Sequence, residues 1–366
     1  MRSIIIGGGV GGLALGAALS GSEWGADVRL FERRPKGAPA GMGFILMPNG
    51  LDALGRIAPG RDWHREGTGV DRVILRTASG EILSEHAADG ARCVGRERFL
   101  DALRACAPVA RIHDEVAVHG LVRPDPRSWR TRAVELDDGS EIEGDLFLAC
   151  DGARSATRAA LMPEARLGEV VVKEIVSIAH CPALAAALGG SFSKFHDEEG
   201  GFAVGMLAES RERVVWFVQF DARRWTHVGG DPAGMAAFIE TRIARWADEV
   251  RTAFVHTDFG RSHLWPTRDL RPLPMLAQEN LALVGDAAHA CLPFTSQGAN
   301  GALVDAALLG ALLADARDAA DLPEALHEYS ATRRPHHRRV FLEGRRLREA
   351  FLAPISRRNP VIPLVR

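Results

Sequence analysis

The chain begins with a short run of β-branched apolar residues at positions 4–6, followed by a glycine-rich turn and an apolar segment over positions 13–19. This pattern predicts a buried strand, a tight turn and a buried helix. Positions 3–19 are also long enough to span a bilayer, but they are rich in glycine and lack the basic start and cleavage site of a signal peptide. We therefore expect no membrane insertion and take the cytoplasm as the default location.

Three later apolar runs, at positions 27–31, 146–150 and 280–284, also predict buried strands. Such strands, alternating with helix patterns, are typical of a parallel sheet. The sequence thus predicts an α/β fold with a Rossmann-like domain. Amphipathic or apolar helices are expected at positions 231–248, 302–314 and 322–348.

A different pattern fills the middle of the chain. Positions 170–180, 191–196, 202–207 and 213–220 are rich in β-branched and aromatic residues and are separated by turn signals. They predict a smaller antiparallel sheet, to which positions 73–76 and 81–83 add a hairpin. Alternation along positions 214–220 gives two apolar faces, so the sequence leaves open which face meets a ligand.

The domains are therefore expected to be discontinuous. We assign positions 1–69, 90–169 and 266–320 to the Rossmann-like domain, 70–89 and 170–265 to the smaller sheet domain, and 321–366 to a C-terminal helical segment.

Charge and cysteine content narrow the class of protein. A formal net charge of −2 over 366 residues makes nucleic acid a poor candidate partner, and we interpret the basic run at positions 333–339 as a solvated helical face. The five cysteines are scattered without a Cys-x-x-Cys motif. This argues against a disulfide framework and a zinc site, so no metal is expected.

The first strand leads into a G-x-G-x-x-G motif formed by Gly7, Gly9 and Gly12, with Val10 and Gly11 between them. Its glycines permit a tight turn and let a pyrophosphate approach the backbone at a helix N-terminus. Glu32 ends the next strand about 20 residues further on, where a carboxylate can bind a ribose diol. Together these features predict a dinucleotide site.

Two further motifs follow buried strands: Asp151-Gly152, and Gly285-Asp286 within the stretch GDAAHACLPFTSQGAN. With the glycine motif and Arg96 in VGRERFLDAL, they make the chain similar to the single-component FAD-dependent aromatic hydroxylases of the para-hydroxybenzoate hydroxylase type. The resemblance covers positions 4 to about 338. It implies a GR2-type FAD domain with tightly but non-covalently bound FAD, and Arg96 as a flavin contact.

The residues expected to bind the cofactor lie in these motifs. Asp286, at a strand's carboxyl end, is placed to accept a hydrogen bond from a ribityl hydroxyl. The helix that starts near position 297 is placed to present its N–H groups to the pyrimidine end of the flavin. The full expected set is Gly7, Gly9, Val10, Gly11, Gly12, Glu32, Arg33, Gly43, Arg96, Asp151, Gly152, Gly285, Asp286, Pro293, Gln297, Gly298, Ala299 and Asn300.

His289 and Ser296 lie within the last motif. For His289 we favour packing or hydrogen bonding over proton transfer, since electrostatic stabilisation by the helix needs no side-chain acid. Ser296 stands where the resembled family usually has glycine, at a position where the backbone needs a positive φ or close approach to the flavin.

The resemblance implies a monooxygenase that uses NADH or NADPH as a transient reductant and O2, and that hydroxylates a small aromatic substrate through a flavin C4a-hydroperoxide. A flavin oxidase or dehydrogenase, a halogenase and a non-catalytic flavin scaffold are the alternatives. The catalytic residues remain unassigned, and the protein is expected to be a monomer or homodimer. The candidate substrate pocket consists of Phe44, Met47, Phe192, Met206, Phe217 and Phe294.

Overall fold

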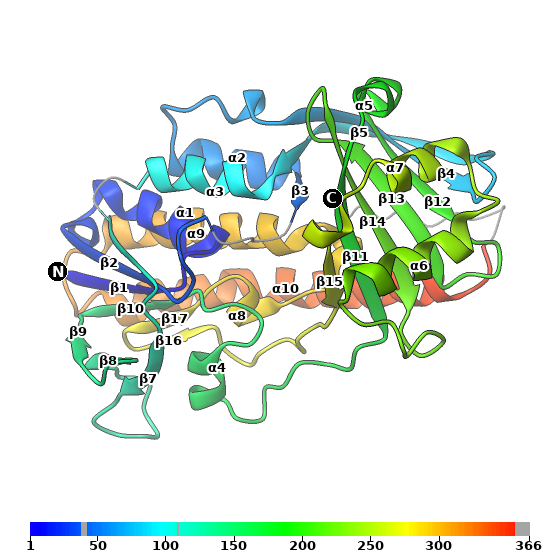
Figure 1. The fold of residues 1–366 in the computed structure, drawn as a ribbon. Helices are drawn as coiled ribbons and strands as arrows, with labels where there is room; N and C mark the ends of the chain where they lie inside the picture. Colours follow the sequence, from blue (N-terminus) through cyan, green and yellow to red (C-terminus); the bar gives the residue numbers. More distant parts are fainter. Residues whose placement is uncertain (38–41, 108–109, 356–366) are drawn as a thin grey trace.

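The computed structural model describes residues 1–37, 42–107 and 110–355. In this part of the chain, two large sheets lie at opposite ends of the molecule (Figure 1). A six-stranded sheet forms one end and an eight-stranded sheet the other. The long helix α10 (Leu322–Leu352) contributes to the core at both ends.

The six-stranded sheet is the predicted parallel one. Its strands are parallel except for the edge strand β16. All four predicted strands are present, and β6 and β16 join them at the edges. The order is β16 (Ala277–Gln278), β17 (Leu281–Leu283), β10 (Leu146–Ala149), β1 (Arg2–Ile6), β2 (Asp27–Glu32) and β6 (Ala110–Asp114).

Helices and a small sheet surround this layer. Buried residues of the sheet and of the neighbouring helices form one continuous core. The helices are α1 (Val10–Ala18), α2 (Pro48–Ile57), α3 (Arg96–Ala105), α4 (Ala156–Leu161), α8 (Asp286–His289) and α9 (Gln297–Asp315), and the small sheet is β7 (Val118–Val122), β8 (Ala133–Leu136) and β9 (Glu141–Glu143).

The eight-stranded sheet contains every strand predicted for the smaller domain, but it is not purely antiparallel. Strands β12 and β4 run parallel, because no hairpin joins them and their direction is therefore unconstrained by a turn. The order is β15 (His263–Pro266), β11 (Val172–His180), β14 (Arg213–Asp221), β13 (Phe202–Ala208), β12 (Ser191–His196), β4 (Thr68–Thr77), β5 (Ile82–Gly95) and β3 (Gly43–Leu46).

This sheet also extends beyond the expected domain boundaries. Strand β3, and the ends of β4 and β5, come from segments that we assigned to the Rossmann-like domain. The eight-stranded sheet therefore takes up more of the chain before position 96 than the sequence suggested.

One face of the eight-stranded sheet is covered by helices α5 (Pro182–Leu188), α6 (Pro232–Ile243) and α7 (Asp248–Val255). Val214, Trp216, Val218 and Phe220 point into the core beneath these helices. The opposite face carries Val215 and Phe217, which pack in a separate apolar cluster. We call this face, which is not covered by α5 to α7, the open face.

Two helix predictions need correction in detail. The helix expected at positions 231–248 ends at Ile243, and a separate helix, α7, begins at Asp248. Between them the backbone N–H of Ala247 donates to the carbonyl of Ala78 at 2.8 Å instead of continuing the helix. The segment predicted as one or two helices at positions 322–348 is the single helix α10, which accommodates Pro335 in its interior.

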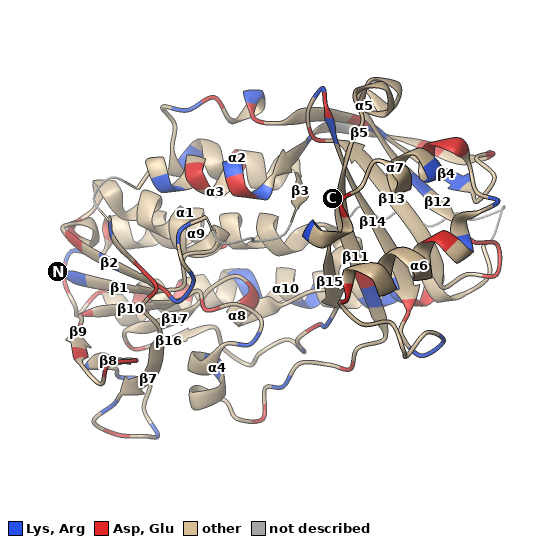
Figure 2. Ribbon diagram, viewed as in Figure 1, with Lys and Arg blue, Asp and Glu red and all other residues tan. Residues whose placement is uncertain are grey.

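Helix α9 is long and apolar enough to cross a membrane by length and composition, but 56% of its apolar window is buried inside the protein. It packs against α1, α2 and α10, and it carries the fully buried carboxylate of Asp305. Its apolar residues are thus accounted for by the core. Basic and acidic residues are spread over both ends of the molecule (Figure 2).

Candidate cofactor and substrate site

The glycine loop between β1 and α1 has the geometry of a phosphate cradle. Gly7 has a φ of 104°, and a Cβ there would overlap the carbonyl of Cys150. A Cβ on Gly12 would overlap the carbonyl of Gly7, whereas none of the described residues comes within 4 Å of a Cβ built on Gly9. Gly9 thus leaves space at the N-terminus of α1, where N–H groups and the helix dipole favour an anion.

Glu32 lies at the end of β2, directly beside this loop. Its carboxylate accepts hydrogen bonds from the backbone N–H of Gly8 at 2.7 Å and of Arg34 at 2.9 Å. A carboxylate has lone pairs beyond these two bonds, so it can still bind ribose hydroxyls. Arg33 is exposed next to it.

The Asp-Gly and Gly-Asp motifs are brought together by Arg158. Its guanidinium donates to the carbonyl of Ala153 at 2.6 Å and to that of Ala287 at 2.9 Å. Asp151 accepts from the backbone N–H of Thr157 at 3.1 Å, while its other carboxylate oxygen is buried without a partner among the described residues. Such an oxygen is suited to a ligand hydroxyl.

Asp286 begins helix α8 with an exposed side chain, directly after Gly285 at φ 61°. Arg96 begins α3, and burial lowers the pKa of its guanidinium while the Asp286 carboxylate opposes that effect. The Nε of Arg96 has no partner within the described chain. The Asp286 carboxylate can accept hydrogen bonds and the Arg96 guanidinium can donate them, and the two groups lie in one region. A dinucleotide, which carries hydroxyls and negatively charged phosphates, requires both kinds of group.

The Asn300 side chain connects helix α9 to the end of strand β3. Its Oδ1 accepts from the backbone N–H of Met47 at 2.9 Å, and its Nδ2 donates to the carbonyls of Ile45 at 2.8 Å and Ser296 at 2.6 Å. The Asn300 side chain is therefore engaged by the protein itself. Pro293, Gly298 and Ala299 are partly exposed, and Gly43 borders the same region on β3.

Ser296 adopts the left-handed conformation that the replaced glycine would favour. Its φ is 53° and its ψ is 20°, and it caps the start of α9. The Oε1 of the neighbouring Gln297 accepts from the Asn49 side chain at 2.9 Å. Serine at position 296 therefore retains the backbone geometry, at some cost in strain.

The open face of the eight-stranded sheet unites part of the expected substrate pocket. Met47 and Phe192 are buried in one apolar cluster against which Phe217 packs. Phe44 is a correction: it packs against the core of the six-stranded sheet and contacts Phe99 edge-on, with ring centroids 5.2 Å apart. Met206 is a correction: it lies in the core beneath α5 to α7, because its position in β13 points to the helix-covered face.

This face changes from apolar to polar along the strands. Lys194, Gly205 and Phe217 pair across β12, β13 and β14, and the ring of Phe217 covers Gly205. Two residues further along β14, Gln219 pairs with Ala203 of β13 on one side and with Glu174 of β11 on the other. Aromatic and charged side chains therefore lie next to each other on this face, and the charged end is buried beside Phe294 and Phe351.

A buried network forms the polar end. Lys194 Nζ donates to Gln219 Oε1 at 2.7 Å, and Gln219 Nε2 donates to Glu174 Oε1 at 3.1 Å. Lys194 Nζ also lies 5.4 Å from the ring centroid of Phe294. Burial lowers the pKa of Lys194 to about 8, against the attraction of Glu174, and raises the pKa of Glu174 to about 7. The sequence gives no signal for the pairing of Lys194 with Gln219 and Glu174.

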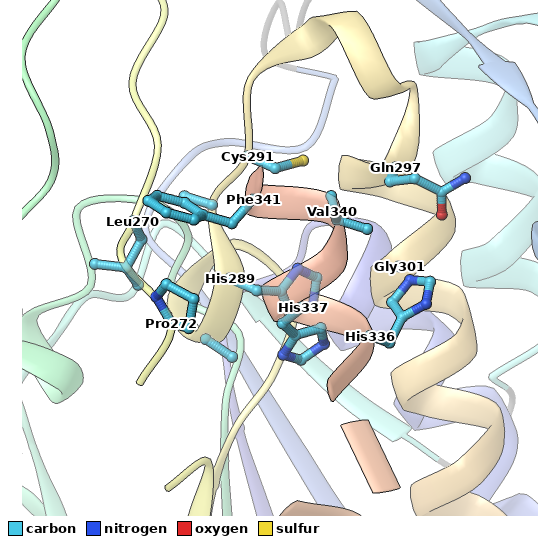
Figure 3. Close-up of a pocket in the computed structure, with 12 residues that line it drawn as sticks. Leu270, Pro272, His289, Cys291, Gln297, Gly301, His336, His337, Val340 and Phe341 are labelled. Atoms are coloured by element: carbon cyan, nitrogen blue, oxygen red, sulfur yellow. The ribbon is translucent and has the colours of Figure 1, made fainter. Parts of the chain in front are cut away.

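Behind the Gly-Asp motif lies a second buried cluster, centred on Asp305. His289 Nε2 is 2.7 Å from one carboxylate oxygen of Asp305, and Arg333 Nε donates to the other at 2.6 Å. Figure 3 shows His289 and His337 side by side, with ring centroids 3.9 Å apart. His289 is thus hydrogen-bonded in the core, as favoured from the sequence.

The basic run of α10 is only partly solvated, which corrects our interpretation of positions 333–339. Arg334, Arg338 and Arg339 are exposed, but Arg333 and His337 point inward to Asp305. Ligand atoms of His289, Asp305 and His337 lie within 4.8 Å of one another, a spacing that a metal ion could use. The buried Arg333 already neutralises this carboxylate, so an internal ion pair explains the cluster better than a divalent cation.

Comparison with known proteins shows which family has this architecture. The family described as FAD binding domain matches residues 1–343. The chain is 29% identical to 3-amino-4-hydroxybenzoate 2-monooxygenase from Streptomyces cremeus over 97% of this chain and 88% of that protein. It is 28% identical to FAD-dependent urate hydroxylase from Klebsiella pneumoniae over 94% and 89%, respectively. Klebsiella pneumoniae HpxO complexed with FAD and uric acid has the same fold, with a TM-score of 0.81, 24% identity and coverage of 96% and 89%.

The protein is therefore a flavin-dependent oxidoreductase in fold and site. More specifically, the chain belongs to the FAD-binding family that includes the aromatic hydroxylases, and it is an FAD-dependent monooxygenase. The expected family, fold class and FAD cofactor are confirmed, with NADH or NADPH as the family's typical co-substrate. Nothing in the comparisons favours an oxidase, a dehydrogenase or a scaffold.

Proposed function

We propose that the enzyme hydroxylates a small aromatic substrate carrying an acidic or strongly polar group, on the open face of the eight-stranded sheet. The reaction consumes one O2 and one NADH or NADPH with a proton, and it yields hydroxylated product, water and the oxidised nicotinamide. When bound, FAD accepts the hydride and transfers one oxygen atom from O2.

The proposed cofactor position follows the three motifs. The glycine loop and the N-terminus of α1 hold the pyrophosphate, and Glu32 holds the adenosine ribose. Asp286 accepts from a ribityl hydroxyl, Arg96 lies beside the same groups, and the start of α9 faces the pyrimidine end of the flavin. Support comes from the open space at Gly9 and the unpartnered oxygen of Asp151.

Replacement of Asp286 tests this position. Asp286→Ala removes one charged acceptor from the proposed ribityl contact, which corresponds to about a 10- to 100-fold weaker FAD affinity. Titration of flavin fluorescence with apoprotein measures the dissociation constant. A variant that binds FAD as tightly as the native chain contradicts the assignment.

The neighbourhood of Lys194 and Phe217 carries the proposal on substrate. The ring of Phe217 covers Gly205 and offers an aromatic surface, while the buried Lys194 ammonium donates a hydrogen bond to Gln219. An ammonium has three donors, so an anionic substituent of the substrate is a suitable further acceptor. The relatives named above act on aromatic or heteroaromatic compounds, in keeping with this proposal.

The first test is a panel of phenols, aromatic acids and purines with FAD-loaded enzyme, NADH or NADPH, and isotopically labelled O2. A product that carries one labelled oxygen atom supports the proposal. Peroxide without labelled product, together with anaerobic turnover on an artificial acceptor, contradicts it and indicates an oxidase or dehydrogenase.

Lys194→Met tests the substrate contact itself. Loss of a charged hydrogen bond corresponds to about a 10- to 100-fold lower kcat/KM for an acidic substrate. Lys173→Met is the matched control, since the Lys173 ammonium donates to the carbonyl of Val228 rather than to Gln219. Equal effects of the two substitutions contradict recognition by Lys194.

A further inference from the structure

The carboxylate of Asp305 joins three segments that are distant in sequence. One oxygen accepts from the backbone N–H of Gly285 at 3.0 Å and lies 2.7 Å from His289 Nε2. The other accepts from Arg333 Nε at 2.6 Å, and the Arg333 guanidinium also donates to the carbonyl of Gly301 at 3.3 Å. The Gly-Asp motif, the first turns of α9 and helix α10 thus converge on one fully buried group.

The segments around Asp305 approach each other too closely for larger residues. A Cβ on Gly301 would lie 2.9 Å from His289 Cε1, and a Cβ on Gly285 would lie 3.0 Å from the Ala302 side chain. Gly285 also has a φ of 61°, which side chains other than glycine rarely adopt. Small shifts of His289 or Asp305 would therefore move the backbone that carries Asp286.

The Asp305 carboxylate and the Arg333 guanidinium form a buried ion pair. Burial raises the pKa of Asp305, but His289 and Arg333 lower it further, so that it stays well below its usual range. Burial lowers the pKa of His337 to about 3, so this ring is neutral where it lies against His289, with ring centroids 3.9 Å apart. The cluster therefore contains an ion pair between Asp305 and Arg333, with neutral His337 beside it.

We propose that Asp305, through Gly285, His289 and Arg333, is a positioning residue that sets the orientation of Asp286 and of the start of α9 for FAD binding. Asp305 itself lies behind these elements and does not contact the cofactor. This inference rests on the proposed FAD position. It goes beyond that proposal because it assigns a role to buried residues outside the cofactor contacts.

The experiment measures FAD affinity and apoprotein stability separately. Asp305→Asn keeps an acceptor for Gly285 but loses the charge that pairs with Arg333, and the expected result is about a 10- to 100-fold weaker FAD affinity in the folded apoprotein. Fluorescence titration gives the dissociation constant, and thermal unfolding of the apoprotein gives the midpoint temperature. An unchanged FAD affinity alongside a lowered midpoint would mean a purely structural role and overturn the inference.

A second pair of variants covers the case in which Asp305→Asn fails to fold. His289→Gln retains a side-chain donor near the position of Nε2 and should keep FAD affinity within about threefold, whereas His289→Leu should lose about tenfold. Equal affinities for these two variants would overturn the inference. Asp221→Asn is the control, because it removes the charge of a buried carboxylate that pairs with the exposed Arg223 at the other sheet, and it should leave FAD affinity unchanged.

Asp286→Asn separates this inference from the proposed function. If Asp286→Asn binds FAD like the native chain while Asp305→Asn binds it weakly, the ribityl contact is wrong and the positioning role acts through α9. If Asp286→Asn weakens binding and Asp305→Asn does not, the proposed cofactor position stands and the positioning role fails.

Discussion

Asn300 and Ile45 are 255 positions apart in sequence, yet the Asn300 side chain donates to the Ile45 carbonyl at 2.8 Å. With its bonds to Met47 and Ser296, this side chain ties helix α9 to strand β3. The consequence is that the start of α9 and the edge of the eight-stranded sheet keep a fixed distance across the proposed flavin site.

Asn300→Ala should therefore lower both stability and FAD affinity. Three hydrogen bonds are lost and backbone groups are left unsatisfied, which corresponds to about 2–4 kcal/mol in the free energy of unfolding. Urea unfolding and fluorescence titration measure the two effects. Asn280→Ala is the matched control, since Asn280 also makes three hydrogen bonds, to Thr131 and Asp145. If both variants retain FAD equally well, the link across the site is unimportant.

Ser296→Gly should stabilise the protein. A serine at φ 53° is strained by about 1 kcal/mol, and glycine relieves this strain, offset in part by its greater freedom in the unfolded chain. We expect a net gain of up to about 1 kcal/mol in chemical denaturation. Ser296→Ala keeps the Cβ and should show no gain; a gain of equal size with alanine would assign the effect to the hydroxyl instead.

Lys194→Met should change how stability depends on pH. Burial raises the pKa of Glu174 from 4.5 to about 7, so across this window the folded state holds a proton that the unfolded state has released, and stability falls as pH rises. Without the Lys194 ammonium the pKa of Glu174 rises further and the window widens. The variant should thus lose at least about 1 kcal/mol more, relative to the native chain, at pH 8 than at pH 5.

Urea unfolding at the two pH values tests this expectation, with Lys173→Met as control. A constant difference between variant and native chain at both pH values would show that Glu174 and Lys194 are not electrically coupled.

Gly205→Ala should disturb the substrate surface. A Cβ at this position overlaps the ring of Phe217, so the ring must leave the sheet and enter the proposed pocket. We expect KM for the aromatic substrate to rise by about tenfold, with FAD affinity unchanged. The double variant Gly205→Ala/Phe217→Leu relieves the overlap and should recover part of the loss. No recovery would place the effect elsewhere in the strand.

The sequence predicted the elements that depend on local pattern. Strand β1, the glycine loop and α1 follow from periodicity and glycine chemistry. The role of the Gly-Asp stretch as a cofactor cradle stays a prediction from its residue types. The family comparison supports the FAD fold on the same segments.

Long-range relationships could not be predicted in this way. Arg333 lies within a basic run that composition assigns to the surface, and only the packing of α10 on α9 brings it to Asp305. Met206 follows the same strand pattern as its neighbours, and the covering helices alone decide its face. The interruption before α7 involves the hydrogen bond from the backbone N–H of Ala247 to the carbonyl of Ala78, and no local sequence pattern predicts this bond.

The parallel pairing of β4 with β12 also determines how the chain can fold. Positions 72–77 pair with positions 191–196. The eight-stranded sheet therefore cannot form completely until the long segment between these two strands, most of which belongs to the Rossmann-like domain, has brought them together. Contacts of such long sequence separation slow folding and couple distant segments. The two sheets should therefore unfold in one cooperative transition, and neither is expected to persist when expressed as a separate fragment.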